Sequence, residues 1–414
     1  MEEEMTLSPE LQSRLNEIGQ LGAEPPSIDS PQTPKVLSRN FQTFNAIDGT
    51  SGVTVGELTV ATPPNQIIGT PDDDKELNGT DGIDEIYGLE GNDAIAGFLS
   101  DDYIVAGPEK TDLSDNDNVV AGGGNDRVDG GWGSDLILGD FNPNADPDRS
   151  AMGDDTLNGG AGDDYLFGQN GKDTLNGDDG ADTLYGGNGD DTLNGGSGND
   201  IAEGGEGIDT IFGNSGDDTL RGDDGNDTLD GGSGKDLIRG GRGNDNLIGG
   251  SEDDELKGDL GNDTLEGGLG NDKLIGVDTA VLPVPELGFG RGEIDTLTGQ
   301  QNNDTFVLGT QLPDGRDFTF YNDGNSGNAG LQDYALITDF GLFNNTQNLG
   351  LDKIQLAGLQ SSYSLGASPI SSTSGTGIFF TDGTVGTVPE LIGIVKNLSP
   401  SQLNLANSSQ FTFV

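Results

Sequence analysis

The chain has 414 residues, of which 72 are Gly and only 31 % are apolar, and its net charge is −55 at pH 7. It contains no Cys and no His, which excludes disulfides, Cys or His metal ligands and histidine-based catalysis. The negative charge opposes binding to nucleic acid and to anionic membranes. No apolar run reaches 18 residues, so we predict no membrane span.

The first 68 residues predict a tail, a short helix and a linker. Ser8-Pro9-Glu10 is typical of a helix start, and residues 23–40 are rich in Pro and Ser. The opening letters MEEEMTLSPE lack the basic-then-apolar pattern of a cleaved export signal. Alternating apolar residues at 52–60 predict a strand. A loose tail and a docked cap both remain open for this segment.

Glycine-rich repeats fill residues 69–298. They begin irregularly, and three interruptions, near 106–120, 141–152 and 276–289, divide them. We expect these insertions to leave the repeat stack as loops.

The stretch 159–275 is a continuous run of 13 units of nine residues, such as GGNGDDTLN and GGSGNDIAE. Position 1 is always Gly, and position 4 is Gly except at Glu252. Position 6 is always Asp, and position 8 is Leu or Ile except at Ala202. We predict a turn over positions 1–6 and a three-residue strand over positions 7–9, with one inward aliphatic residue per unit. Two units then form one coil of 18 residues, and coils stack in parallel.

The position-6 Asp residues predict a cation site. One carboxylate per turn, stacked coil on coil, places like charges a few ångströms apart, which is strongly repulsive. The same turns offer backbone carbonyls, and an all-oxygen environment without Cys or His suits calcium.

These nonapeptides resemble the repeats-in-toxin (RTX) family, whose repeat is GGxGxDxUx with U a large aliphatic residue. The resemblance implies an all-β parallel β-roll in which calcium lies between turns i and i+2. It assigns the ligands to position-6 carboxylates and to carbonyls of the turns, with about 11 ions in the run 159–275. The implied Asp ligands are Asp84, Asp93, Asp102, Asp126, Asp135, Asp155, Asp164, Asp173, Asp182, Asp191, Asp200, Asp209, Asp218, Asp227, Asp236, Asp245, Asp254, Asp263 and Asp272. The implied Gly positions are Gly162, Gly171, Gly180, Gly189, Gly198, Gly207, Gly216, Gly225, Gly234, Gly243, Gly261 and Gly270.

Residues 299–414 predict a β-rich domain that caps the roll. Apolar and polar residues alternate around 318–320, 334–340, 353–356 and 377–380, and 391–395 is an apolar run of strand length. We expect Phe306, Phe318 and Phe320 to cover the end of the roll. The closing FTFV resembles the apolar end of a type I export signal.

The resemblance implies a secreted or cell-surface, calcium-binding structural protein that leaves the cell through type I export machinery. We expect no enzyme. Zinc proteases of this export class need an HExxH helix, and serine hydrolases use a GxSxG motif with a His base. A hydrolase that uses two carboxylates stays open on residues alone, but no catalytic domain is visible. An adhesin or accessory toxin-like protein, which would contact cell-surface or matrix components through its loops or C-terminal domain, also stays open. We do not expect a pore-forming toxin, which would need amphipathic or apolar membrane segments ahead of the repeats, because residues 1–68 are short and polar.

Overall fold

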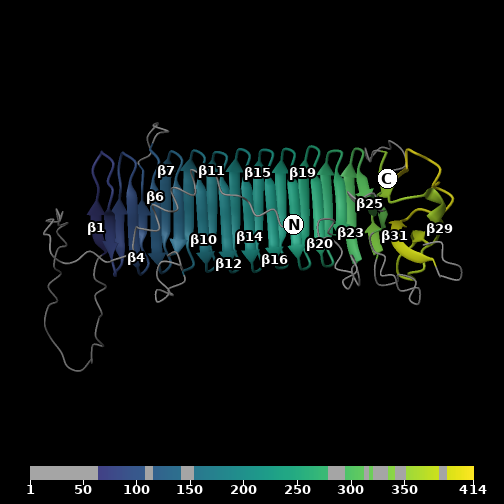
Figure 1. Cartoon of the computed structure of the whole chain (residues 1–414), viewed down its shortest axis with the longest axis horizontal. Coiled ribbons are helices and arrows are strands. Elements are labelled where there is room, and N and C mark those ends of the chain that lie inside the picture. The colour runs from purple at the N-terminus through teal and green to yellow at the C-terminus, as the bar shows by residue number, and fades with distance from the viewer. Residues whose placement is uncertain are drawn as a thin grey trace, which may run out of the picture.

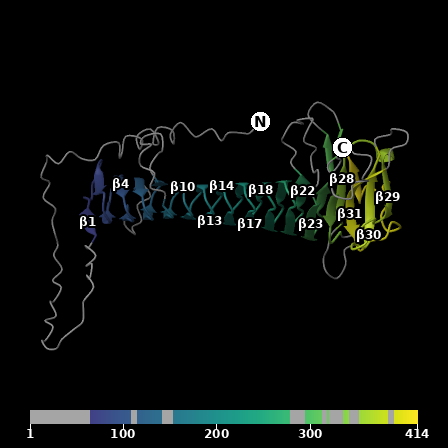
Figure 2. The ribbon, with the colours of Figure 1, turned by 90° about the horizontal axis from the view of Figure 1, so that it is seen from below.

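A computed structural model describes residues 64–107, 115–140, 153–277, 294–311, 317–319, 334–340, 351–381 and 389–414. The strands stack along one long axis, with the N-terminal strands at one end and the C-terminal strands at the other (Figure 1). A view turned by 90° shows two layers of strands along most of this axis (Figure 2). The predicted N-terminal helix, the strand at 52–60, the insertion 141–152 and residues 278–289 of the third insertion lie outside the described residues. The third insertion begins later than predicted, because residues 276 and 277 end a strand of the roll.

Sheet A has 16 strands and sheet B has 14. Sheet A contains, in spatial order, β1 (Asn65–Ile68), β3 (Asp84–Tyr87), β5 (Tyr103–Val105), β7 (Arg127–Trp132), β9 (Thr156–Ala161), β11 (Thr174–Asp179), β13 (Thr192–Ser197), β15 (Thr210–Ser215), β17 (Thr228–Ser233), β19 (Asn246–Ser251), β21 (Thr264–Leu269), β23 (Ile294–Gln301), β27 (Tyr334–Ile337), β31 (Glu390–Lys396), β30 (Gly375–Phe380) and β29 (Tyr363–Ala367). Sheet B contains β2 (Leu77–Thr80), β4 (Ala94–Leu99), β6 (Asn118–Gly123), β8 (Leu136–Asp140), β10 (Tyr165–Asn170), β12 (Thr183–Asn188), β14 (Ile201–Glu206), β16 (Thr219–Asp224), β18 (Leu237–Arg242), β20 (Glu255–Leu260), β22 (Lys273–Val277), β24 (Thr305–Val307), β28 (Lys353–Leu356) and β32 (Phe411–Phe413). A separate hairpin joins β25 (Gly309–Gln311) to β26 (Asp317–Thr319), and one 3₁₀ turn, η1, spans Gln360–Ser362.

The register confirms a coil of 18 residues. Leu175 of β11 pairs with Leu193 of β13, and Leu193 pairs in turn with Ile211 of β15. All three side chains are fully buried between the two sheets. The same alignment holds in sheet B, so every position-8 side chain of the run adds one layer to a narrow apolar core. The chain is therefore the predicted all-β parallel β-roll.

The strands are longer than the three residues predicted. Each typical strand of the run has six residues and continues through positions 1–3 of the following unit, as in Thr192–Ser197. Only positions 4–6 form the turn. The prediction was too short because Gly at positions 1 and 2 suggested a turn, whereas both residues lie within the six-residue strand, and Gly196 pairs with Asn214 of the next coil in spite of its positive φ. Position 1 needs Gly for a different reason: a Cβ at Gly195 would overlap the Oδ2 atom of Asp200.

The interruption predicted at 106–120 is also too long. Residues 118–123 form β6, and Val119 is fully buried in the core. Ala106 is buried as well. The pattern was missed because Asp115 stands at position 4, where most units have Gly, although Asn116, Asp117 and Val119 occupy positions 5, 6 and 8 of an ordinary unit.

The C-terminal segment extends both sheets. Strands β27 and β28 continue the parallel stack, whereas β29, β30 and β31 pair antiparallel at the end of sheet A. The strands predicted near 334–340, 353–356, 377–380 and 391–395 are present. Phe306 does not cover the end as predicted, because it is fully buried inside the stack and pairs with Ile354 of the next coil. The side chains of Phe318 and Phe320 lie outside the described residues.

Candidate metal sites in the turns

Two kinds of turn join the sheets. A-to-B turns lead from a strand of sheet A to a strand of sheet B, and B-to-A turns lead back. Each contains positions 4, 5 and 6 of a unit. Because successive coils are in register, the position-6 aspartates of each kind form one column along the roll. The predicted ligands therefore lie together in two columns.

Backbone hydrogen bonds link each aspartate to the next in its column. The N–H of Asp182 donates to Oδ1 of Asp200, and the N–H of Asp200 donates to Oδ1 of Asp218, both at 2.8 Å. The A-to-B column runs through Asp74, Asp93, Asp117, Asp135, Asp164, Asp182, Asp200, Asp218, Asp236, Asp254, Asp272, Asp304 and Asp352. The B-to-A column runs through Asp84, Asp102, Asp126, Asp155, Asp173, Asp191, Asp209, Asp227, Asp245, Asp263 and Asp295.

The set of ligands predicted from the sequence omitted five members of these columns: Asp74, Asp117, Asp295, Asp304 and Asp352. Asp74 stands in a unit with one residue too many, Asp117 was assigned to an interruption, and the other three stand where position 4 is not Gly or the spacing is disturbed. The signal that finds all but Asp74 is the short pattern Asp-x-apolar, as in Asp117-Asn118-Val119 and Asp304-Thr305-Phe306.

The second carboxylate oxygen of most column members is buried without a hydrogen-bond partner in the described residues. Asp191, for example, is 1 % exposed. The Oδ2 atom has no partner in Asp93, Asp102, Asp126, Asp155, Asp173, Asp182, Asp191, Asp200, Asp209, Asp218, Asp227, Asp236, Asp245, Asp254, Asp272 and Asp304. A buried carboxylate oxygen without a partner is costly, so this regular series of oxygens fits a bound cation.

Burial and like charge act together on these carboxylates. Burial raises the pKa of Asp182, the charge of the neighbouring Asp200 adds to this rise, and the hydrogen bond from the Asp164 N–H opposes it, so that the pKa is about 7. Burial likewise raises the pKa of Asp254 to about 8, and Asp236 and Asp272 on either side add to the effect. The ion-free columns therefore oppose full ionisation at neutral pH.

Backbone carbonyls complete the oxygen lining of the turns. A Cβ placed on Gly198 would overlap the carbonyl oxygen of Gly180, and one on Gly196 would overlap that of Asp178. The position-2 and position-4 carbonyls of one coil thus face the next coil along the stack. No three carboxylates converge on one point in the described residues, so a cation bound here would need many of its ligands from these carbonyls. Carboxylate and carbonyl oxygens with several ligands per ion are the environment that calcium prefers.

Position 2 is a conformational requirement that sequence reasoning missed. Its φ is positive throughout the run, whether the residue is Gly, as at Gly196 (φ +113°), or not, as at Asp178 (φ +72°), Asn214 (φ +72°) and Gln169 (φ +79°). Most non-Gly residues at this position are Asp or Asn, which tolerate the left-handed region best. Glu252, at position 4, has φ +85°, whereas Gly234 and Gly261 at the same position have +127° and +145°.

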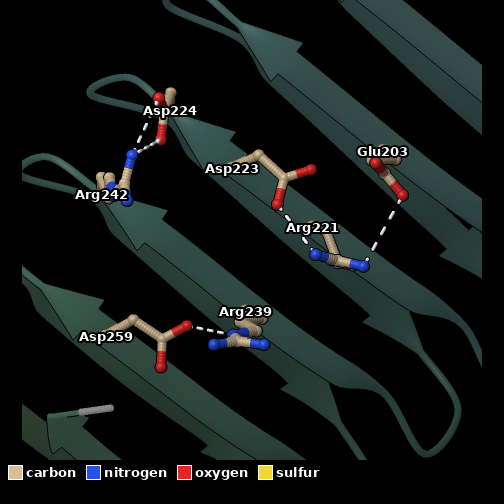
Figure 3. Close-up of polar contacts among 7 residues, drawn as sticks. All are labelled: Glu203, Arg221, Asp223, Asp224, Arg239, Arg242 and Asp259. Carbon is tan, nitrogen blue, oxygen red and sulfur yellow. Dashed lines mark hydrogen bonds and ion pairs between the residues drawn. The ribbon is translucent and has the colours of Figure 1, made fainter. Parts of the chain in front are cut away.

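Five of the seven basic side chains of the run lie on the strands of sheet B, outside its apolar interior, and the other two, Lys172 and Lys235, stand in the turns. Figure 3 shows Arg221 between Glu203 and Asp223, Arg239 beside Asp259, and Arg242 beside Asp224. Lys257 and Lys273 both contact Glu255 on the same face, at 2.8 and 3.0 Å. These cations are therefore committed to surface carboxylates that join neighbouring coils, and the buried columns need another source of positive charge.

This architecture defines a class: a parallel β-roll whose turns carry stacked, buried carboxylates suited to calcium. A family model described as "RTX calcium-binding nonapeptide repeat (4 copies)" matches residues 78–108, 113–142, 152–184, 167–202, 203–238 and 239–274. The repeat region 78–274 belongs to this RTX family and binds calcium through its repeats. No curated protein matches the chain. In the described residues, no helix has the length and apolarity needed to cross a membrane.

Proposed function

We propose that this protein is a secreted or cell-surface structural protein whose repeats fold when they bind extracellular calcium. The observation that carries the proposal is the pair of aspartate columns, in most of whose members the buried Oδ2 atom has no hydrogen-bond partner among the described residues. A cation at each step would remove the repulsion within a column and satisfy these oxygens at once.

The charge of the run supports multiple ions. Residues 159–275 contain 28 acidic and 7 basic side chains, and 28 − 7 leaves a net charge of −21. Seven A-to-B turns and six B-to-A turns leave 6 + 5 = 11 gaps between successive turns. Eleven calcium ions carry a charge of +22, close to the charge they would neutralise. We assign the ligands in these gaps to the position-6 aspartates and to the position-2 and position-4 carbonyls.

The remaining parts of the proposal follow from the same architecture. Residues 69–298 would form the calcium-dependent roll, residues 299–414 a cap that closes it, and residues 1–68 an appended tail. We propose export of the unfolded chain by type I machinery, since cytosolic calcium is too low to fill sites of the ~10⁻⁴–10⁻³ M affinity typical of extracellular modules. A binding role rather than catalysis is supported by the absence of His and Cys from the sequence.

A matched pair of variants tests the sites. Asp191 belongs to a column and is buried, whereas its neighbour Asp190 is exposed. Asp191→Asn and Asp190→Asn remove the same charge one residue apart. We expect Asp191→Asn to raise the calcium concentration at the midpoint of folding, measured by circular dichroism, and Asp190→Asn to leave it nearly unchanged. Equal midpoints for both variants would overturn the assignment of the columns as ligands.

A further inference from the structure

A second ladder of side chains, at position 5 of the turns, runs beside the aspartate columns. The N–H of Asp217 donates to Oδ1 of Asn199 at 2.9 Å, and the N–H of Lys235 donates to Oδ1 of Asp217 at 2.9 Å. The same contact recurs along both edges of the roll. Its acceptors in the 13-unit run are Asp163, Asp190, Asn199, Asp217, Asn226, Asn244, Asp253, Asn262 and Asn271.

This position-5 ladder and the aspartate columns reach in opposite directions. At position 5, the side chain of the earlier coil accepts from the backbone of the later coil. At position 6, the side chain of the later coil accepts from the backbone of the earlier one, as when Asp200 N–H donates to Asp218 Oδ1. Adjacent residues of one turn therefore hold the next coil from both sides. This arrangement fixes the distance between successive turns, and with it the spacing of the oxygens that face the gap.

The ladder is interrupted at four steps of the run, for a chemical reason. Four units have at position 5 a residue without a side-chain oxygen that could accept a hydrogen bond: Lys172, Ala181, Ile208 and Lys235. The turns that follow them, with Asp190, Asn199, Asn226 and Asp253 at position 5, lack this support. Asn and Asp serve equally well elsewhere, so the shared property is the acceptor oxygen and not the charge.

We propose that the position-5 Asn and Asp residues are positioning residues for calcium: each one sets the gap between two turns, so that supported gaps bind calcium more tightly than unsupported ones. The inference rests on the proposed calcium sites for its functional consequence. The hydrogen bonds of the ladder do not depend on that proposal, because they are observed in the geometry of the turns.

Three variants on one edge test the proposal in the full-length, calcium-loaded protein. Asn199→Ala removes the acceptor for the Asp217 N–H, and Asn199→Asp keeps an acceptor while adding a charge. Ala181→Asn installs an acceptor for the Asn199 N–H. The readouts are amide hydrogen exchange at residues 199 and 217, and the calcium concentration at the folding midpoint.

We expect Asn199→Ala to speed amide exchange at residue 217 about fivefold, the factor that corresponds to the loss of one ordinary hydrogen bond. The same variant should raise the calcium concentration at the folding midpoint. Asn199→Asp should restore slow exchange, and Ala181→Asn should slow exchange at residue 199 by a similar factor. Unchanged exchange in Asn199→Ala would overturn the ladder itself. Faster exchange with an unchanged calcium midpoint would overturn its positioning role, as would an Asn199→Asp variant that behaves like Asn199→Ala. The variant Asp191→Asn shows separately whether the proposed calcium sites are wrong, because it changes an aspartate column and leaves the position-5 ladder unaltered.

Discussion

The run 159–275 and the C-terminal strands continue the same two sheets but fill the space between them differently. In the run, each unit contributes one aliphatic side chain, and a buried carboxylate accompanies every one of them. Beyond Leu308 the core includes Phe340, Tyr363, Leu403 and Phe411. Aromatic rings also contact one another there: the ring centroids of Tyr363 and Phe413 are 5.9 Å apart. The comparison teaches that one sheet topology can continue either with buried carboxylates beside a narrow aliphatic core or with a core that contains aromatic rings.

The largest expected effect is the loss of the roll when calcium is removed. In chelator at neutral pH, the columns repel and the narrow core cannot compensate, so most of the strand signal in circular dichroism should disappear. Trp132, the only Trp of the chain, lies in β7 of the roll and its fluorescence reports on this part of the molecule. Amide hydrogen exchange at Tyr334 and Tyr363 reports on the C-terminal strands. If both probes change together at one calcium concentration, the two regions do not differ as we describe.

Next in size is the effect of a cavity in the narrow core. Leu193→Ala should destabilise the calcium-loaded roll by about 2–5 kcal/mol, because the fully buried side chain packs between Leu175 and Ile211 of the neighbouring coils. Thr192→Ala, one residue away on the outer face, should stay within about 0.5 kcal/mol of the parent. Urea unfolding at saturating calcium measures both. Equal losses would mean that position 8 is not the core.

A smaller effect is expected from pH in the absence of calcium. Burial raises the pKa of Asp182 and Asp209 to about 7, above the value of about 3.9 in an unfolded chain. Because the carboxyl pKa is higher in the folded state, protonation of the carboxyl stabilises that state. This stabilisation is complete when the pH is below the pKa of the unfolded chain, and it is lost as the pH rises through about 6–8. In chelator, the strand signal should therefore be larger at pH 4.5 than at pH 8. Sedimentation shows whether the acid form is monomeric, and equal spectra at both pH values would contradict the prediction.

The smallest predicted effect concerns Glu252. Its positive φ is costly for a residue with a side chain, and a Cβ on Gly270 would overlap its carbonyl oxygen, so that oxygen still faces the next coil. Glu252→Gly should stabilise the calcium-loaded roll by roughly 0.4–1 kcal/mol. The Glu252 carboxylate also helps to raise the pKa of Asp236, which places negative charge near that column. A higher calcium midpoint in the variant would show that this charge attracts calcium and outweighs the strain.

Much of the roll could be predicted from the sequence because its period is strict. The position-8 core, the 18-residue coil and the stacking of the aspartates follow from that period. The strand length was wrong because Gly at positions 1 and 2 looked like turn residues. Asp117 was missed where an insertion disturbed the period, and the position-5 ladder was missed because Asn, Asp, Lys, Ala and Ile all occur there. Such contacts between residues 18 apart become visible only once the coils are placed in register.

The C-terminal strands were predictable as strands but not in their arrangement. Alternation locates β27 and β28, yet nothing in their sequence distinguishes the parallel pairing of β28 from the antiparallel pairing of β30. Phe306 was placed at the end of the roll because aromatic residues suggest a cap. The structure shows instead that the stack continues past it, through Ile354 to Phe411.

The central claim is that calcium ions fill the gaps along both columns, and equilibrium dialysis against radioactive calcium tests it most directly. At about 5 mM free calcium, above the ~10⁻⁴–10⁻³ M affinity expected, each chain should bind about eleven ions or more, with binding that rises together with the strand signal. A folded chain that binds only one or two ions would contradict the account, because most of the buried carboxylate oxygens would then lack the cation we assign to them.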